Sequence, residues 1–295
     1  MDYRTDLAIE KMESLDKDKG EGSQIDGVSI NKLDYGEHVS ATRIEIKDQI
    51  GSLRMQKPVG NYITIEAKGM IDENEEVKEN LISAVSGELR EMISFHYNLK
   101  VLIAGLGNKQ VTPDSLGPET ASKIRITRHL FVMFDADGDD EMSNVSCVVP
   151  GVSATTGMET ADMIKKAVEI TRPEVVIVID SLAARNIKRV STTIQITDTG
   201  ISPGAGMGNR RKGINEESIG TRVIAIGVPT VIDAETIIRD TLNENSHTAK
   251  EIDDYIERFD QQMIVTSTEI DMLIKEFSDI IAAGINKTLH PGIYS

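Results

Sequence analysis

The stretch that decides the fold is VLIAGLGNKQVTPDSLGP, from Val101 to Pro118. It combines a short apolar run, a glycine turn and one loop carboxylate, Asp114. A second apolar run, in EVVIVIDSLAAR, leads directly into Asp180. Each pattern is typical of a buried strand with an aspartate near its C-terminal end, where open α/β sheets carry their ligand and catalytic sites. The sequence therefore predicts two carboxylates at one rim of a parallel sheet. Such a pair can divide into an acid and a base, because like charges push their pKa values apart.

Apolar strands alternate with helical segments along most of the chain, which favours a parallel sheet covered by helices on both faces. We expect strands at 41–50, 61–67, 100–104, 174–179, 190–197, and 221–225 continuing into IGVPTVIDA. We expect helices at 74–95, from Thr112 or Asp114 to about His129, and at 156–170, 249–262 and 269–290. The predicted fold is α/β and three-layered, with a mostly parallel twisted sheet flanked by helices and a small β-rich N-terminal addition.

The ends and insertions of the predicted domain differ in composition from its body. Residues 1–30 are acidic, carry glycine and serine turn signals, and are typical of a loosely held arm. Residues 31–70 are expected to form the β-rich addition. Residues 131–144 contain the acidic surface insertion FDADGDDEMSN. No repeat or low-complexity tract divides the remainder.

The composition excludes several classes of function. The chain has 295 residues, 39% apolar and 27% charged, which is ordinary for a soluble protein with a sizeable core. A net charge of −16 disfavours contact with nucleic-acid phosphates, and with 4% aromatic residues the chain has few side chains on which nucleic-acid bases could stack. The polar amino terminus and the lack of a long apolar run predict neither a signal peptide nor a membrane span. With a single cysteine, Cys147, no intrachain disulfide is expected, and we predict a cytoplasmic protein without direct nucleic-acid or membrane contacts.

Several local motifs are weaker signals. GLGN after a strand lacks the third glycine of a dinucleotide fingerprint, since Gln110 stands there, and a tight strand-exit turn explains it better. Asp198-Thr199-Gly200 matches the tripeptide of pepsin-like proteases, but those enzymes are all-β and use two copies. Asp198 is therefore better explained as a loop carboxylate. The five histidines show no metal-ligand spacing, and no serine lies in a GxSxG elbow.

A glycine-rich segment follows, from Gly200 to Asn209, and leads into three basic residues. Two interpretations remain open: a lid or substrate-facing loop beside the acidic site, and a flexible surface loop. The candidate substrate-binding residues of this segment are Gly204, Gly206, Gly208, Arg210 and Arg211.

An ordered series of segments over nearly the whole chain resembles one family, the germination proteases of spore-forming bacteria, which digest small acid-soluble spore proteins. The segments are RTDLAIE at 4–10, LIAGLGNKQVTPDSLGP at 102–118, PGVSATTGMET at 150–160, VVIVIDSLAARNIKRVSTTIQITDTGISPGAGMGNRR at 175–211, VIAIGVPTVIDAETI at 223–237 and IVTSTEIDMLI at 264–274.

The resemblance implies an atypical aspartic endopeptidase without a cofactor, similar in fold to the hydrogenase-maturation peptidases. The family's two proposed catalytic aspartates map onto Asp114 and Asp180. The resemblance also implies a homotetramer in the developing spore or spore core, made as an inactive precursor. Self-cleavage would fall between Asp6 and Leu7, so that residues 1–6 are a propeptide and residues 7–295 a single peptidase domain.

The chemistry then requires one ionised aspartate to activate water and one protonated aspartate to donate a proton, and the sequence does not assign the two roles. The main alternative is a metal-dependent peptidase on the same scaffold, with both aspartates and a distant histidine as ligands. The further alternatives are a spore-specific protein that binds small acid-soluble proteins without cleaving them, and a nucleotide-binding enzyme.

Overall fold

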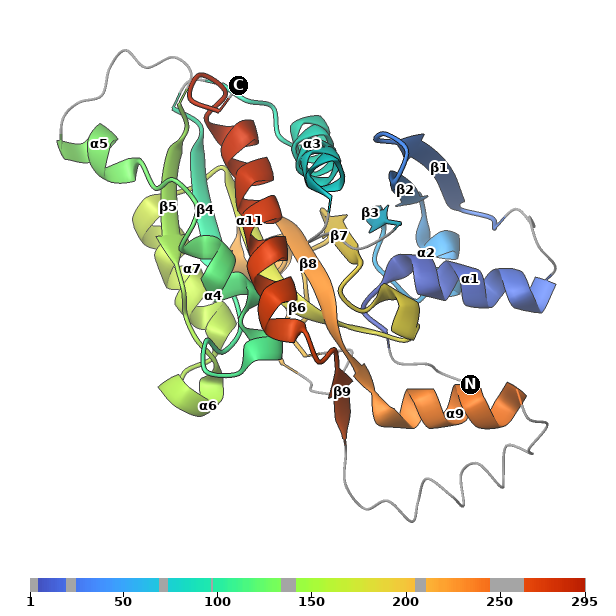
Figure 1. Cartoon of the computed structure of the whole chain (residues 1–295). Helices are drawn as coiled ribbons and strands as arrows, with labels where there is room; N and C mark the ends of the chain where they lie inside the picture. Colours follow the sequence, from blue (N-terminus) through green and yellow to red (C-terminus); the bar gives the residue numbers. More distant parts are fainter. Residues whose placement is uncertain are drawn as a thin grey trace.

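The computed structural model describes residues 5–19, 25–68, 74–96, 98–133, 142–204, 211–244 and 263–294. Within this part of the chain, nine strands form one sheet with helices on both faces (Figure 1). The strands run in the order β1-β2-β3-β7-β8-β6-β4-β5, and β9 pairs with β8. Their bounds are β1 Val28–Asp34, β2 Val39–Ile46, β3 Gly60–Ala67, β4 Lys100–Gly105, β5 Asn144–Val148, β6 Val175–Ala184, β7 Thr193–Thr197, β8 Arg222–Asp233 and β9 Ile264–Thr266.

The predicted α/β class is confirmed, and the sheet has two parts. Strands β5, β4, β6 and β8 pair in parallel; Asp180 lies within β6, and Asp114 lies in the 3-10 helix that follows β4. Strands β1, β2 and β3 pair antiparallel and join the parallel part through β7. The β-rich N-terminal segment is thus a continuation of the main sheet.

The helices complete the three layers around β6, whose side chains alternate between the two faces. The odd-numbered residues Val175, Ile177 and Ile179 point into a core shared with α3, α4 and α11. On the other face the even-numbered residues contact α7 near the start of the strand and α1 near its end. The helices are α1 Ala8–Lys19, α2 Gln49–Met55, α3 Glu75–Met92, α4 Leu116–Ala121, α5 Arg128–Met133, α6 Ser153–Thr156, α7 Thr160–Thr171, α8 Glu216–Ile219, α9 Ala234–Glu244 and α11 Ile270–Leu289. In the described part of the chain, none is long and apolar enough to cross a membrane.

Helices α3 and α11 form where the sequence predicts them, and they lie side by side (Figure 1). Asn74 caps α3 by accepting hydrogen bonds from the backbone N–H groups of Glu76 and Val77. The two helices approach closely at Gly284, where an added Cβ would lie 2.5 Å from Val85 Cγ1. This contact sets their separation.

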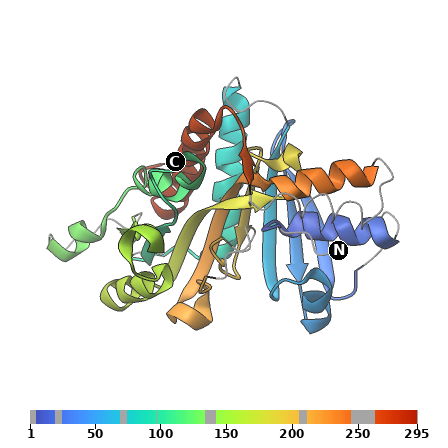
Figure 2. The same cartoon turned by 90° about the horizontal axis from the view of Figure 1, so that it is seen from below.

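The expectation of a loosely held N-terminal arm is wrong for residues 7–19. Helix α1 packs against the strands of the N-terminal part of the sheet (Figure 2). Leu7 and Ala8 are completely buried, and Met12 is 8% exposed. Ala8, Met12 and Leu15 recur at helical spacing and form an apolar stripe that the acidic composition of the segment conceals.

The single helix expected up to about His129 is also wrong. The chain forms a 3-10 helix at Thr112–Asp114, then α4, and only later α5. The break has a tertiary cause. Arg125 donates its backbone N–H to Asn286 Oδ1 of α11 (2.9 Å), and Thr127 donates its own to the Val145 carbonyl of β5 (3.1 Å). These amides are therefore lost to a helix.

Other differences are local. The elements α2, α6, α8, α9, β1, β5 and β9 have no counterpart in the sequence-based expectation. The expected helix at 249–262 lies outside the described residues, as do residues 134–141 of the acidic insertion.

We predict that Gly284→Ala destabilises the fold through the α3–α11 contact. The added methyl group overlaps Val85, and overpacking of this kind costs about 1–3 kcal/mol of unfolding free energy. In a Val85→Ala background the same substitution should be neutral or stabilising, because alanine is favoured over glycine in a helix by about 1 kcal/mol. Urea unfolding of the four proteins measures both effects. An equal loss in the two backgrounds would contradict the contact.

Candidate active site

Asp180 lies on β6, the strand between β4 and β8 in the parallel part of the sheet. It is 5% exposed, and its Oδ1 accepts a hydrogen bond from the backbone N–H of Ser181 (2.9 Å). Directly after it, the register with β8 shifts between Leu182 and Ala183. The carboxyl group is therefore held on a rigid strand just before an irregularity, a common way of presenting a side chain at a site.

Asp114 comes to the same place from the loop after β4. The chain leaves this strand with the Leu106 N–H bonded to the Ile179 carbonyl (2.8 Å). Asn108 then donates its backbone N–H to both the carbonyl oxygen and Oδ2 of Asp114 (2.9 Å each). The Thr230 hydroxyl of β8 holds the carbonyl of Pro113 (2.7 Å). Asp114 thus bonds back to its own loop, and does not cap α4.

Two glycines make this loop possible. Gly107 has φ +107°, and a Cβ there would lie 2.0 Å from the Asp114 carbonyl oxygen. A Cβ at Gly117 would lie 2.5 Å from the carbonyl of Ile179, the residue before Asp180. Because these clashes are with backbone atoms, no side-chain movement relieves them. The glycine turn of the fold-deciding stretch therefore brings the two aspartates together.

The two carboxyl groups line one cavity of 440 Å³. Asp6, Ser181 and Arg211 contribute further polar groups to it. The hydroxyl of Ser181 is buried and has no hydrogen-bond partner among the described residues. Most of the remaining wall is apolar, from Leu106, Val111, Val152, Leu182, Val231 and Ile264. A pocket of this kind, with few convergent polar groups, is typical of a ligand site.

The cavity affects the pKa values of the two aspartates differently. Burial raises the pKa of Asp180 well above its ordinary value, and the negative charges of Asp114 and Asp6 raise it further. Burial also raises the pKa of Asp114, but a backbone N–H and the charge of Arg211 oppose this shift. The pKa of Asp180, the more deeply buried of the two, is therefore raised further than that of Asp114.

The N-terminal segment closes one side of the cavity. Asp6 donates its backbone N–H to the Ala183 carbonyl (3.1 Å), and its Oδ2 accepts from the Ala183 N–H (2.9 Å). Its carbonyl oxygen accepts from Lys57 Nζ (3.0 Å) and from Gln195 Nε2 (3.1 Å). Burial lowers the pKa of Lys57.

Gln195 binds the backbone on both sides of Leu7. While its Nε2 binds the Asp6 carbonyl, its Oε1 accepts from the N–H of Ala8 (2.8 Å). Leu7, between them, is completely buried. The bond between Asp6 and Leu7 is therefore held in one conformation beside the cavity.

The structure places the other predicted site residues as follows. Gly204 and Arg211 line the cavity, whereas Gly206, Gly208 and Arg210 lie outside the described residues. Asp198 accepts from the backbone N–H (2.8 Å) and Nδ2 (2.7 Å) of Asn61, so it links β7 to β3. Burial raises the pKa of the Cys147 thiol to about 11, which makes it a poor nucleophile.

The described residues contain no group of three or more His, Cys, Asp or Glu side chains arranged to hold a metal ion. His96 bonds to Glu174 (2.9 Å), and His290 bonds to the Arg125 carbonyl (3.1 Å). His247 lies outside the described residues.

Sequence reasoning missed Lys57, Gln195 and Thr230. Each contacts a residue more than 50 positions away, at separations of 51, 189 and 117. No local motif connects such residues, so only the folded sheet brings them to the site.

Comparison with known proteins places this chain in a family. A family model described as Germination protease matches residues 5–254. A germination protease of Caldanaerobacter subterraneus subsp. tengcongensis is 42% identical, with 98% of this chain and 95% of the relative covered. One from Clostridium perfringens is 37% identical (98% and 96%), and one from a Geobacillus species is 34% identical (98% and 94%).

Among solved structures, the NiFe hydrogenase maturation protease HycI of Thermococcus kodakarensis aligns with a TM-score of 0.37 and 14% identity. The alignment covers 67% of this chain and 98% of that one. The family model covers most of the chain, and the relatives align with it almost from end to end. The chain therefore belongs to the germination protease family, and it is a protease.

Proposed function

We propose that this protease degrades small acid-soluble spore proteins during germination, with Asp114 as general base and Asp180 as general acid. The observation that carries the proposal is the cavity that both carboxyl groups share, in which burial raises the pKa of Asp180 well above its ordinary value while a backbone N–H and Arg211 oppose the rise at Asp114. Two carboxyl groups with separated pKa values are what acid–base hydrolysis of a peptide requires.

In this mechanism Asp114 removes a proton from water, and the water oxygen attacks the substrate carbonyl carbon. Asp180 donates its proton to the carbonyl oxygen or to the leaving nitrogen, so no covalent intermediate forms. Arg211 assists because its charge favours the ionised form of Asp114. The unpaired hydroxyl of Ser181 is available to bind the substrate backbone.

The docking of the N-terminal segment supports self-processing between Asp6 and Leu7. Asp6 lines the cavity, and its carbonyl already accepts two hydrogen bonds. Donors aimed at a carbonyl oxygen stabilise the negative charge that develops there during attack. In the uncut chain the Asp6 carboxylate also accepts a hydrogen bond from the backbone N–H of Ala183, three residues after Asp180, so that this N–H cannot bind a substrate. Residues 1–6 thus act as a propeptide that blocks part of the cavity.

The proposed substrates fit the charge and shape of the site. Arg211 offers a positive charge to an acidic peptide segment, and an unfolded substrate protein can enter as an extended chain. The net charge of −16 keeps the protease itself away from DNA. The proposal includes residues 7–295 as a single peptidase domain, assembly into a homotetramer and location in the spore core, as the family resemblance implies. Light scattering tests the tetramer.

We predict that Asp114→Asn and Asp180→Asn each lower the rate of cleavage by at least about 100-fold, because each removes one proton transfer. The assay mixes chains lacking residues 1–6 with a purified small acid-soluble spore protein in the presence of chelator, and mass spectrometry identifies the products.

The matched control for this assay is Asp198→Asn, which changes an aspartate outside the cavity and should cleave at close to the wild-type rate. Full activity in either cavity variant would remove that residue from the mechanism. Loss of wild-type activity in chelator, restored by added metal, would replace the aspartate mechanism with a metal-dependent one.

We predict that Asp180→Asn is more stable than the wild type at neutral pH. Because the folded-state pKa of Asp180 is raised, the unfolded chain releases this proton at a lower pH than the folded chain. Wild-type stability therefore falls through the window above about pH 4, by up to about 1.4 kcal/mol for each pH unit. Urea unfolding against pH should show the advantage of the variant growing through this window and vanishing below it. An advantage that does not depend on pH would contradict the assignment.

We predict that the intact chain, incubated alone at mildly acidic and neutral pH, converts to a product with the mass of residues 7–295. Asp114→Asn and Asp180→Asn should remain intact, whereas Asp198→Asn should convert like the wild type. A cut at another bond, or conversion of both cavity variants, would refute self-processing by this site.

A further inference from the structure

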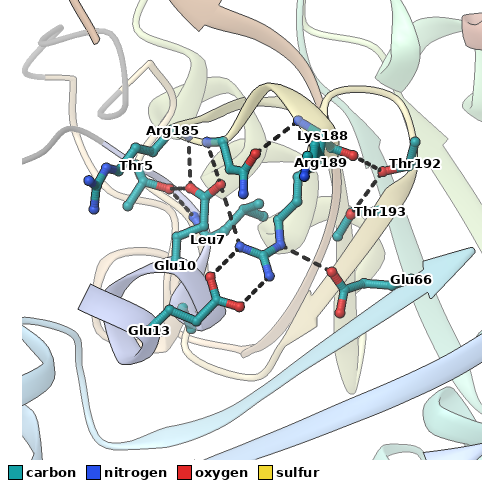
Figure 3. A network of polar contacts seen from close by, with 12 residues as sticks. Thr5, Leu7, Glu10, Glu13, Glu66, Arg185, Lys188, Arg189, Thr192 and Thr193 are labelled. Atoms are coloured by element: carbon teal, nitrogen blue, oxygen red, sulfur yellow. Dashed lines mark hydrogen bonds and ion pairs between the residues drawn. The ribbon is translucent and has the colours of Figure 1, made fainter. Parts of the chain in front are cut away.

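A threonine links the proposed new N-terminus to a buried carboxylate. The backbone N–H of Leu7 donates to Thr5 Oγ1 (3.0 Å), and the same hydroxyl donates to Glu10 Oε2 (Figure 3). Glu10 is 3% exposed, and Leu7 is completely buried. In the uncut chain, Thr5 is therefore the bridge between the nitrogen of Leu7 and the carboxylate of Glu10.

Glu10 shares the guanidinium group of Arg189 with two other carboxylates. Arg189 lies among three carboxylates and binds Glu13 with both Nη atoms (2.7 and 2.6 Å) and Glu66 with Nε (3.1 Å). Its closest contact with Glu10 is longer, 3.8 Å. Lys57 also acts on this carboxylate electrostatically, but its Nζ binds the carbonyl of the propeptide. A further cation at Glu10 would therefore find a buried carboxylate that Arg189 contacts less closely than it contacts Glu13 and Glu66.

Cleavage before Leu7 would create that cation. Hydrolysis adds water across the C–N bond, which leaves a carboxylate on Asp6 and an amine on Leu7 that takes up a proton at neutral pH. The same cut removes Thr5 and vacates the position of its hydroxyl. The buried side chain of Leu7 and the bond from Ala8 to Gln195 keep the new end in place.

We propose that the Glu10 carboxylate is a binding site for the α-ammonium group of Leu7 in the processed chain. This inference rests on the proposed cut between Asp6 and Leu7, but its test does not require the chain to cut itself.

The ion pair would act on the residues that follow β6, the strand of Asp180. Glu10 accepts from the backbone N–H groups of Arg185 and Asn186 (2.8 Å each), the two residues that follow β6. β6 carries Asp180. Pairing with the new N-terminus would therefore fix the Glu10 carboxylate, and with it the turn that ends the catalytic strand.

The test compares two termini in two backgrounds. One chain begins at Leu7, released from a fusion partner by a protease that leaves no extra residue. The other carries one additional glycine before Leu7, which converts the ammonium into an amide and displaces the charge. Both are made with Glu10 and with Glu10→Gln, and the intact chain is the reference. Calorimetry gives Tm, and hydrogen exchange reports on the amides of Arg185 and Asn186.

With Glu10 present, the chain beginning at Leu7 should melt about 4 °C or more above the glycine-extended chain, and the two amides should exchange more slowly. In the Glu10→Gln background the two termini should melt together. Equal Tm values with Glu10, or a difference that persists with Glu10→Gln, would overturn the proposal.

A second measurement tests the proposal without the Glu10→Gln variant, in case that variant does not fold. With Glu10 retained, the α-amine of Leu7 in the folded chain should react with an acylating reagent far more slowly than the amine of the added glycine, and equally fast in urea. Similar reactivity of the two amines in the folded chains would overturn the proposal independently. Either result stands whether or not the intact chain processes itself.

Discussion

The parallel pairing of β4 with β6 is the constraint on which the site depends. Gly105 pairs with Ile179, and the chain then leaves β4 by bonding the Leu106 N–H to the carbonyl of that same residue. The residue before Asp180 therefore fixes where the loop of Asp114 begins. A shift of one residue in this register would turn Asp180 to the opposite face of the sheet. The pairing of β4 with β6, two segments far apart in the sequence, thus brings the two carboxyl groups together and holds them rigidly.

The same arrangement opposes stability. Carboxyl groups in a largely apolar cavity lose hydration, and the second negative charge raises the cost of ionising the first. The extensive apolar core on both faces of β6 offsets this cost. In the uncut chain Asp6 adds a third carboxylate to the cavity and further disfavours ionisation of Asp180. Loss of the residues before Leu7 would relieve this repulsion and leave the buried side chains of Leu7, Ala8 and Ile9 in place, because these residues lie after the proposed cut.

The sequence predicted what apolar periodicity and motifs can reveal. The runs that form β4 and β6 are buried on both faces, so the two strands were predictable, although β6 continues past Asp180 to Ala184 and Asp114 lies in a turn well after β4. The docking of α1 was not, because Glu10 and its neighbours look like a solvated acidic surface. Their partner Arg189 lies 176 positions beyond Glu13. Likewise, the break after α4 depends on the Arg125 amide, which bonds to a helix near the C-terminus of the chain. Signals of this kind exist only in three dimensions.

The cluster around Arg189 is only partly enclosed, because the side chains of its partners Glu13 and Glu66 are 42% and 32% exposed. The side chain of Arg189 is 9% exposed and that of Glu10 only 2%, so mobile ions have little access to their charges. In exposed pairs such as Lys166 with Glu169, whose side chains are 73% and 51% exposed, dissolved ions reach both charges and weaken their attraction. The Debye length is about 8 Å in physiological salt and shortens as salt is added. Added salt therefore weakens the exposed pairs and the mutual repulsion of a chain with net charge −16, while the buried apolar contacts of Leu7, Ala8 and Met12 continue to hold α1. Concentrated electrolyte should consequently make this acidic protein more compact without loosening its N-terminal helix.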